Sequence, residues 1–136
     1  MKRFLSVLAV CALCVADGLP ATASAKRLNV VTTLSTFADL ARTVGGDQVE
    51  VSAVASPKFN PHFIEPKPSD VLKVKRADLF IHAGLDLELW RGPLLDAAGN
   101  TELFPGSRGE LDISQGIELL EVPGRAATRA EGDIHL

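Results

Sequence analysis

A histidine and a glutamate lie in a proline-rich stretch that we call the proline loop, residues 57–68. Four of its twelve residues are proline, a residue that fixes the backbone φ and leaves few alternative conformations. His62 is therefore presented at a low ordering cost, and a neutral imidazole is the commonest protein ligand for zinc. Glu65 has three possible roles: a metal ligand, an acceptor for the imidazole N–H, or a solvated carboxylate. From the loop alone, a surface or packing role for His62 is also open.

A second histidine, His82, ends a short apolar run over residues 79–81. It is either a cleft-facing auxiliary or second-shell ligand or a strand-end histidine satisfied by hydrogen bonds, and we favour the second interpretation. If His62 and His82 held a metal with Glu65 as general base, the protein would be a small exported metallohydrolase. No His-Glu-x-x-His pattern, nucleophile elbow or glycine-rich phosphate loop supports that chemistry.

The elements that position these residues alternate between strand and helix. Residues 28–32 form an apolar run typical of a buried strand, and residues 49–53 alternate between apolar and polar, as a second strand would. Between them, apolar residues recur at helical spacing: Phe37, Leu40, Ala41 and Val44. We expect Ser35 or Thr33 to cap the start of this helix and Gly45 to end it.

Later in the chain, Pro68 suits the first position of a short helix that extends toward Ala77, and Asp70 suits its first turn, where the helix dipole favours a negative charge. Residues 79–81 are predicted to form a buried strand. Trp90 is expected in the core, on a helix that the Gly92-Pro93 pair kinks or splits. The remaining predictions are two weaker strands and a polar loop: residues 111–113, residues 117–122 and residues 123–133.

Strands that alternate with helices predict an α/β fold, a parallel sheet flanked by helices. Ligands of such folds bind outside the carboxyl ends of the strands. The proline loop leaves the second predicted strand, and His82 and Gly84 follow the third. Both candidate regions are therefore expected at one edge of the sheet.

Residues 1–25 are predicted to be a secretory signal peptide, and residues 26–136 the exported domain. Two basic residues precede a 12-residue apolar run, and Ala23-Ser24-Ala25 supplies a small-residue cleavage site. A membrane span needs about 20 apolar residues, so the run is too short to serve as an anchor. We expect a periplasmic or secreted protein with no stable membrane insertion after cleavage.

The residue composition excludes several classes of function. Both cysteines, Cys11 and Cys14, lie inside the leader, and neither follows the small residue that lipoprotein processing requires. The exported domain then has no cysteine, which excludes disulfide scaffolds, thiol catalysis and cysteine-based zinc sites. The formal net charge is -3 and only 5% of residues are aromatic, so neither a basic surface nor a stacking platform for nucleic acid is expected.

Six short motifs run along residues 28–122. In order, they are Val30-Val31-Thr32-Thr33, Val44-Gly45-Gly46-Asp47, Asn60-Pro61-His62 with Glu65-Pro66, Pro68-Ser69-Asp70-Val71, Ala77-Asp78-Leu79 and Gly84-Leu85-Asp86-Leu87-Glu88. Together, in this order and spacing, they resemble the N-terminal lobe of the zinc/manganese substrate-binding proteins of bacterial metal ABC importers.

The resemblance implies a single lobe of a two-lobed periplasmic metal-binding protein, whose lobes are joined by a long helix and hold one divalent ion between them. It implies that His62 is the first metal ligand. Asn60 stands where the family usually has Asp, at the residue that supports the loop. The family's next ligand lies in a Pro-His-x-Trp motif, and this chain reaches Leu136 before any such motif. The chain is thus expected to be either a fragment or a half-site that binds metal weakly.

The leading hypothesis is a receptor, not an enzyme, which captures Zn(II) or Mn(II) and passes it to the permease of an ABC importer. Imidazole suits zinc and carboxylate suits manganese, and the ligands that would decide between them are expected beyond Leu136. The alternatives are the small exported metallohydrolase described above and an adhesin-like secreted domain.

Overall fold

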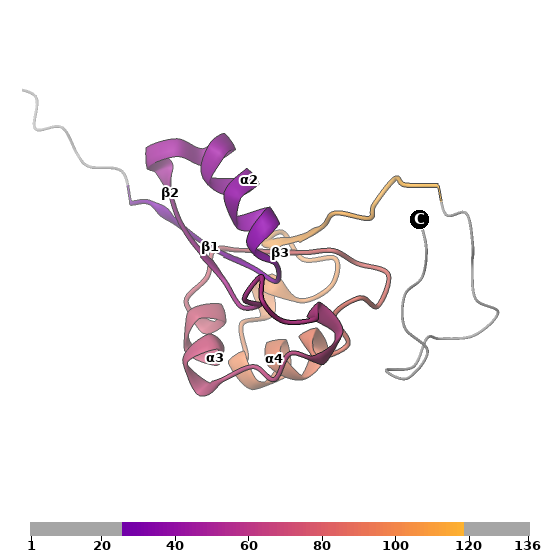
Figure 1. Ribbon diagram of the computed structural model, residues 1–136. Helices are drawn as coiled ribbons and strands as arrows, with labels where there is room; N and C mark the ends of the chain where they lie inside the picture. The colour runs from indigo at the N-terminus through magenta and orange to yellow at the C-terminus, as the bar shows by residue number, and fades with distance from the viewer. Residues whose placement is uncertain (1–25, 119–136) are drawn as a thin grey trace, which may run out of the picture.

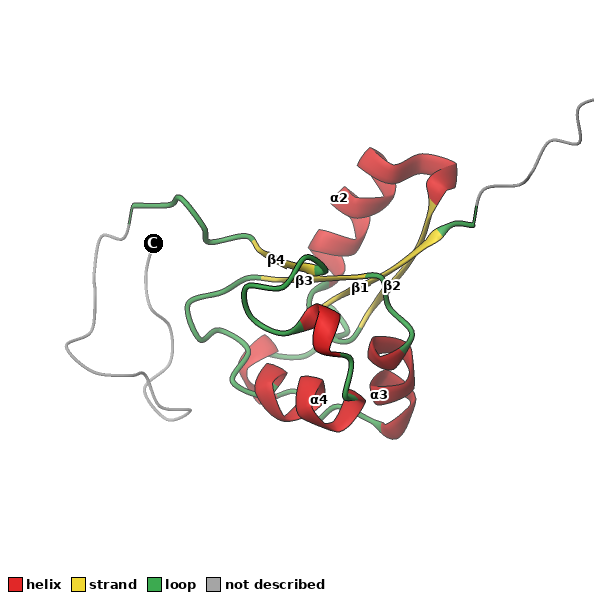
Figure 2. Cartoon of the chain, turned by 180° about the vertical axis from the view of Figure 1, so that it is seen from behind, coloured by secondary structure: helices red, strands yellow, loops and turns green. Residues whose placement is uncertain are grey.

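The computed structural model describes residues 26–118, which form a four-stranded parallel sheet with helices on both faces (Figures 1 and 2). The strands are β1 (Leu28–Thr32), β2 (Val49–Ala53), β3 (Leu79–His82) and β4 (Glu110–Asp112), in the order β2-β1-β3-β4. The helices are α2 (Ser35–Gly45), α3 (Pro68–Lys75) and α4 (Arg91–Ala98), with short 3₁₀ turns at Gly46–Gln48, Pro61–Phe63 and Thr101–Leu103. The predicted α/β class with a parallel sheet is confirmed.

The first two strands have the predicted bounds, but the ends of α2 differ from the prediction. Leu34 occupies the N-cap without a side-chain hydrogen bond, because the Thr33 hydroxyl donates to Glu88 instead and Ser35 already lies in the helix. At the other end, Gly46 rather than Gly45 takes the positive φ, of 50°. Gly45 has a different role, since a Cβ at this position would lie 2.5 Å from the Val49 side chain.

Helix α3 begins at Pro68 as predicted, where the missing proline N–H removes no helical hydrogen bond. The Asp70 carboxylate accepts a hydrogen bond from the Lys67 backbone N–H at 3.0 Å, which satisfies one of the free donors at the helix start. The helix ends at Lys75, and Ala77 is buried just beyond it.

Helix α4 is neither kinked nor split, contrary to the prediction. It begins at Arg91, so that Gly92 and Pro93 fall in its first turn, where proline is tolerated. Strand β4 covers Glu110–Asp112, one residue earlier than predicted. Ile117 and Glu118 are not in a strand, and the rest of that predicted strand and the predicted loop after it lie outside the described residues.

The two faces of the sheet are covered unequally. Helices α3 and α4 cover one face, which we call the packed face, and α2 lies on the other, which we call the open face (Figure 1). The main core cluster consists of Val31, Val74, Ala77, Phe80, Trp90, Leu94, Leu95, Ala98 and Leu103. Within residues 26–118, no helix has the length and apolar character needed to cross a membrane.

Candidate metal centre

The proline loop leaves the carboxyl end of β2 and returns to the body of the protein at α3. Its central turn, Pro61–Phe63, is capped by Asn60, whose side-chain oxygen accepts from the His62 backbone N–H at 3.0 Å. The Asn60 carbonyl also accepts from the Phe63 N–H at 3.1 Å. Asn60 thus supplies the side-chain acceptor that a short turn needs, so the departure from Asp preserves this local support.

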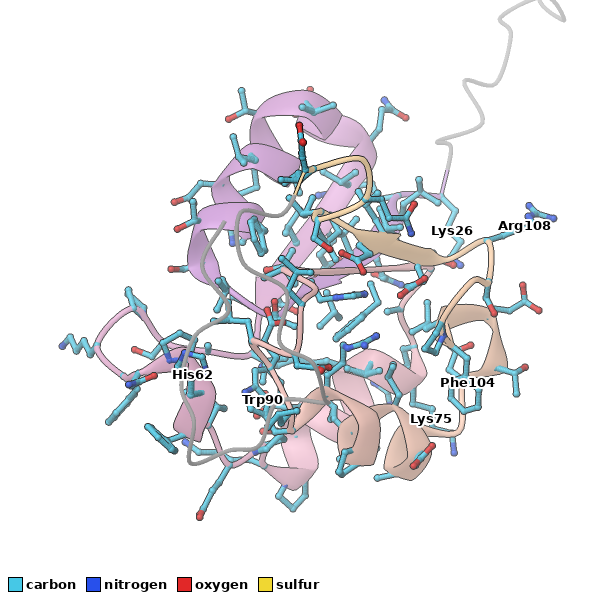
Figure 3. All side chains as sticks on the ribbon, turned by 90° about the vertical axis from the view of Figure 1, so that its right-hand side faces the viewer. Lys26, His62, Lys75, Trp90, Phe104 and Arg108 are labelled. Carbon is cyan, nitrogen blue, oxygen red and sulfur yellow. The ribbon has the colours of Figure 1, made fainter. Side chains whose placement is uncertain are left out.

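His62 is half-buried at this turn, with its ring centroid 6.1 Å from that of Phe63. Pro61, the residue before it, accepts a hydrogen bond from a distant part of the chain. The indole N–H of Trp90 donates to the Pro61 carbonyl at 2.7 Å. Figure 3 labels both side chains. Trp90 lies in the core, as predicted, with 6% of its surface exposed. Its hydrogen bond spans 29 residues, and no local pattern in the sequence predicts it.

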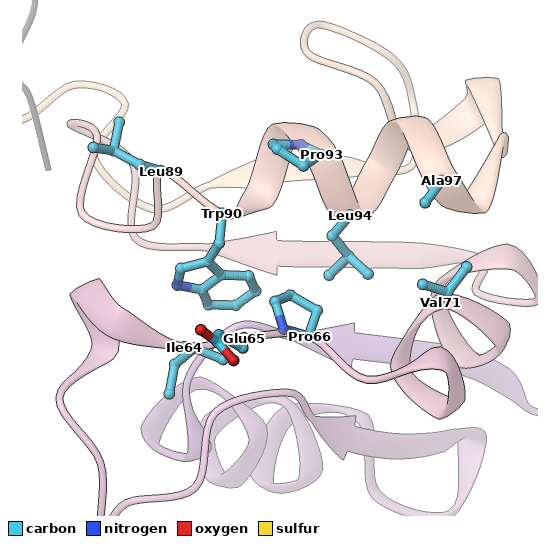
Figure 4. Close-up of a pocket in the computed structure, with 9 residues that line it drawn as sticks. All are labelled: Ile64, Glu65, Pro66, Val71, Leu89, Trp90, Pro93, Leu94 and Ala97. Atoms are coloured by element: carbon cyan, nitrogen blue, oxygen red, sulfur yellow. The ribbon is translucent and has the colours of Figure 1, made fainter.

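Glu65 is exposed and lines a cavity of about 420 Å³ between the proline loop, α3 and α4. Figure 4 shows Glu65 and Pro66 facing the Trp90 indole across this cavity. The other lining residues are mainly apolar and include Val71 and Leu94. Within residues 26–118, no three side chains of His, Cys, Asp or Glu are grouped so that they could hold a metal ion.

His82 ends β3 as predicted, and its side chain is buried on the packed face. Its Nε2 lies 2.7 Å from Oε1 of Glu110 and 3.3 Å from Nη1 of Arg91. Nη1 of Arg91 lies 3.5 Å from the same carboxylate oxygen. His82 Nδ1 is buried and has no hydrogen-bond partner among the described residues. This geometry is that of a hydrogen-bonded strand-end histidine, the interpretation that the sequence favoured.

A buried carboxylate, Glu88, lies where the chain leaves β1 and β3, and it is not among the site residues expected from the sequence. Its Oε1 accepts from the Thr33 hydroxyl at 2.6 Å and from the Ala83 N–H at 3.0 Å. Only 3% of Glu88 is exposed. The available signal in the sequence was a glutamate within a leucine-rich stretch. If such a carboxylate is buried, it must accept hydrogen bonds from neighbouring donors.

The turn between β3 and Glu88 has an uncommon backbone. Gly84, Leu85 and Asp86 have positive φ angles of 81°, 54° and 59°. Gly84 is required for a second reason, since a Cβ would lie 2.1 Å from an Asp112 carboxylate oxygen. Such backbone conformations cost about 1–3 kcal/mol for each non-glycine residue and persist only where the surroundings enforce them.

Residues 30–136 match the family model described as "Zinc-uptake complex component A periplasmic", ZnuA. The chain belongs to the ZnuA family. This agrees with the resemblance that the six motifs carry.

Relatives in this family include the manganese ABC transporter substrate-binding lipoprotein PsaA of Streptococcus mitis. It is 32% identical over 126 residues, which cover 90% of this chain and 39% of PsaA. The metal ABC transporter substrate-binding lipoprotein FimA of Streptococcus parasanguinis is 32% identical over 135 residues, 92% of this chain and 42% of FimA. The chain thus spans about two fifths of the length of these relatives.

Solved structures support the same assignment. The periplasmic zinc binding protein TroA from Treponema pallidum superposes with a TM-score of 0.59 and 26% identity, over 71% of this chain and 34% of TroA. A zinc-bound ZnuA deletion mutant gives a TM-score of 0.61 and 28% identity, over 74% of this chain and 36% of that one. The four-stranded unit therefore has the fold of one lobe of a ZnuA-family protein.

Proposed function

We propose that this chain supplies one lobe of an exported receptor that captures Zn(II) or Mn(II) and delivers it to the permease of an ABC importer. The observation that carries the proposal is His62, presented on a capped turn at the carboxyl edge of the sheet in a member of the ZnuA family. Delivery of an ion requires binding and release but no bond chemistry, so the receptor is not an enzyme.

In this proposal the metal ion is cargo, and the residues of the loop have distinct roles. His62 binds the ion through a neutral imidazole nitrogen. Glu65 accepts a hydrogen bond from the other ring nitrogen and so orients the ring. His82, buried and paired with Glu110, supports the carboxyl edge from the core and acts on the metal only through the scaffold. The remaining ligands come from a second lobe, as in a receptor that closes on its ion.

Export is part of the same proposal. Cleavage after Ala25 releases residues 26–136 into the periplasm or the medium. The relatives named above are described as lipoproteins, whereas the leader of this chain lacks a small residue before Cys11 and Cys14. Mass spectrometry of the exported protein is expected to give an unmodified N-terminus at Lys26. A lipid-modified cysteine at the N-terminus would contradict this point and leave the metal proposal intact.

Zinc and manganese titrations of the exported chain test the role of His62. The unaltered chain is expected to bind Zn(II), measured by competition with a fluorescent chelator, and His62→Ala is expected to weaken binding at least tenfold, because a ligand is removed. Glu65→Gln is expected to weaken it about 10-fold through loss of the charged partner of the imidazole. Lys58→Ala, in the same loop, is the control and leaves the affinity unchanged. Detectable binding that is equal in the unaltered chain and in His62→Ala would contradict the proposal.

A further inference from the structure

We infer that Trp90 is a positioning residue for the metal ligand His62, acting through the hydrogen bond from its indole N–H to the Pro61 carbonyl. This inference rests on the proposed function, in which His62 binds the ion. It adds that the affinity of the loop for metal depends on a residue that does not touch the metal. Trp90 lies 29 residues from its bonding partner Pro61 along the chain.

The proline loop needs support from outside itself. Proline has no backbone N–H, so the four prolines of the loop remove four donors that would otherwise tie it to neighbouring backbone. Asn60 caps the turn locally, but it belongs to the same loop and moves with it. The Trp90 bond, by contrast, joins the residue next to His62 to the buried core. Its loss would leave a buried indole N–H without a partner, which disfavours the broken state.

Trp90 is itself held firmly, because both of its flanks are fixed to the sheet. On one side, Glu88 accepts hydrogen bonds from Thr33 and Ala83, which follow β1 and β3. On the other side, Arg91 lies 3.5 Å from Glu110 of β4. The segment from Glu88 to Arg91 is therefore held at the ends of β1, β3 and β4. Trp90, within this segment, adds a hydrogen bond to the proline loop.

The strained turn before Glu88 supports the same interpretation. Leu85 and Asp86 both hold left-handed φ angles, which most residues avoid. Glu88 restrains this turn at Ala83, and the Leu87 N–H bonds to the Gly84 carbonyl at 3.1 Å. Backbone strain concentrates where a protein must hold a functional group in one place. Here the strained turn leads directly into the residues that carry Trp90.

A purely structural role for Trp90 makes a different prediction from a positioning role. If the ring only fills the core, any substitution that weakens the core should act on stability alone. If the N–H positions His62, removing it should weaken metal binding beyond what the loss of stability explains. Trp90→Phe tests this, because it keeps an aromatic ring and removes the donor. The matched control is Leu103→Val, at a fully buried residue of the same core cluster that is not bonded to the proline loop.

The experiment measures Zn(II) affinity and urea stability of the exported chain for four proteins: unaltered, Trp90→Phe, Leu103→Val and His62→Ala. We expect Trp90→Phe to weaken zinc binding about tenfold, the range seen for residues that orient a ligand. Leu103→Val is expected to lower stability and leave the affinity unchanged. Unchanged affinity in Trp90→Phe with loss in His62→Ala would overturn the positioning role alone. Unchanged affinity in both variants would overturn the proposed function as well.

A second measurement needs no metal. Trp90 is the sole tryptophan in the sequence, so its indole N–H gives a single NMR signal. In the metal-free protein this signal is expected to exchange slowly with solvent, because the N–H is buried and bonded. In Trp90→Phe, the His62 ring signals are expected to broaden or shift, while in Leu103→Val they keep their positions. An indole N–H that exchanges at the rate of a free indole, or His62 signals that do not respond, would contradict the inference.

Discussion

The packed face and the open face of the sheet differ in how completely they are covered. On the packed face, which α3 and α4 cover, Val74, Phe80 and Leu103 are fully buried. On the open face, α2 buries only Ala38, and Leu40 and Val44 are 58% and 88% exposed. An apolar groove of about 270 Å³ runs between α2 and the exposed sides of β3 and β4, and Leu111 and Ile113 line it.

The topology explains this difference. The chain steps from β1 to β2 in one direction and then to β3 and β4 in the other. Right-handed crossovers place helices on opposite faces when the direction of the step changes, so α2 lies on one face and both α3 and α4 lie on the other. Trp90 and the proline loop are attached to the packed face. The candidate metal ligand His62 is therefore attached to the packed face, the side of the sheet whose apolar residues are buried.

The largest expected effect concerns the buried polar cluster on the packed face. His82→Ala is expected to destabilise the protein by about 3–5 kcal/mol, because it leaves the buried Glu110 carboxylate without its closest partner. Urea unfolding measured by circular dichroism gives this value. Glu110→Gln is the matched control, since an amide oxygen still accepts from the imidazole and the loss should be smaller. A His82→Ala protein as stable as the unaltered chain would show that the cluster contributes no stability.

A pair of leucines tests the two faces directly. Leu103→Ala is expected to cost about 2–5 kcal/mol, because it opens a cavity in a close-packed core. Leu40→Ala, the same change on the open face, is expected to alter the free energy of unfolding by about 0.5 kcal/mol or less. Both values come from the same denaturant titration. Similar losses in the two variants would mean that the open face is covered in solution.

The smallest expected effect is pH-dependent and lies at the amino end of the sheet. The Asn29 backbone N–H, 2.8 Å from Asp78, is the main cause that lowers the pKa of this carboxylate below its usual 3.8. Lys26 lowers the pKa further, whereas burial acts in the opposite direction. A lowered folded-state pKa adds stability above about pH 3.8 that is lost as the pH falls through the folded value.

Asp78→Asn removes this titration. The unaltered protein is expected to be slightly more stable than the variant at pH 6, and the difference is expected to shrink as the pH is lowered toward 2. Urea midpoints across that range measure it. A stability difference that stays constant from pH 6 to pH 2 would show that the carboxylate does not act through its charge.

Local patterns in the sequence were sufficient to predict most of the elements. The apolar run at β1, the alternation at β2 and Pro68 at the start of α3 each gave the correct element, because each depends on neighbouring residues. The ends of α2 were predicted less well. Thr33 was expected to cap the helix but bonds to Glu88, which is 55 residues away. A contact over that separation leaves no local trace in the sequence.

The candidate site also combines local features, which the sequence shows, with long-range contacts, which it does not. His62 and Asn60 belong to one short loop and were both singled out from the sequence, although the cap that Asn60 provides was not predicted. The support by Trp90 and the partnership of His82 with Glu110 depend on how distant strands and helices pack, so only the fold revealed them. Gly84 was visible as a glycine after β3, but the left-handed conformation of Leu85 was not, because leucine avoids it, and Asp86, a residue type that tolerates it, was not singled out.

The all-parallel sheet also sets how the chain must fold. In the described part of the chain, no two neighbouring strands are joined by a hairpin, and the paired residues are far apart in sequence: Val30 pairs with Val51 and with Leu79. Each pairing therefore requires the closure of a long loop before it is stabilised, which makes the folding rate slow for a domain of this size. During that time the unpaired strands are available to other chains, so refolding yield is expected to fall as protein concentration rises.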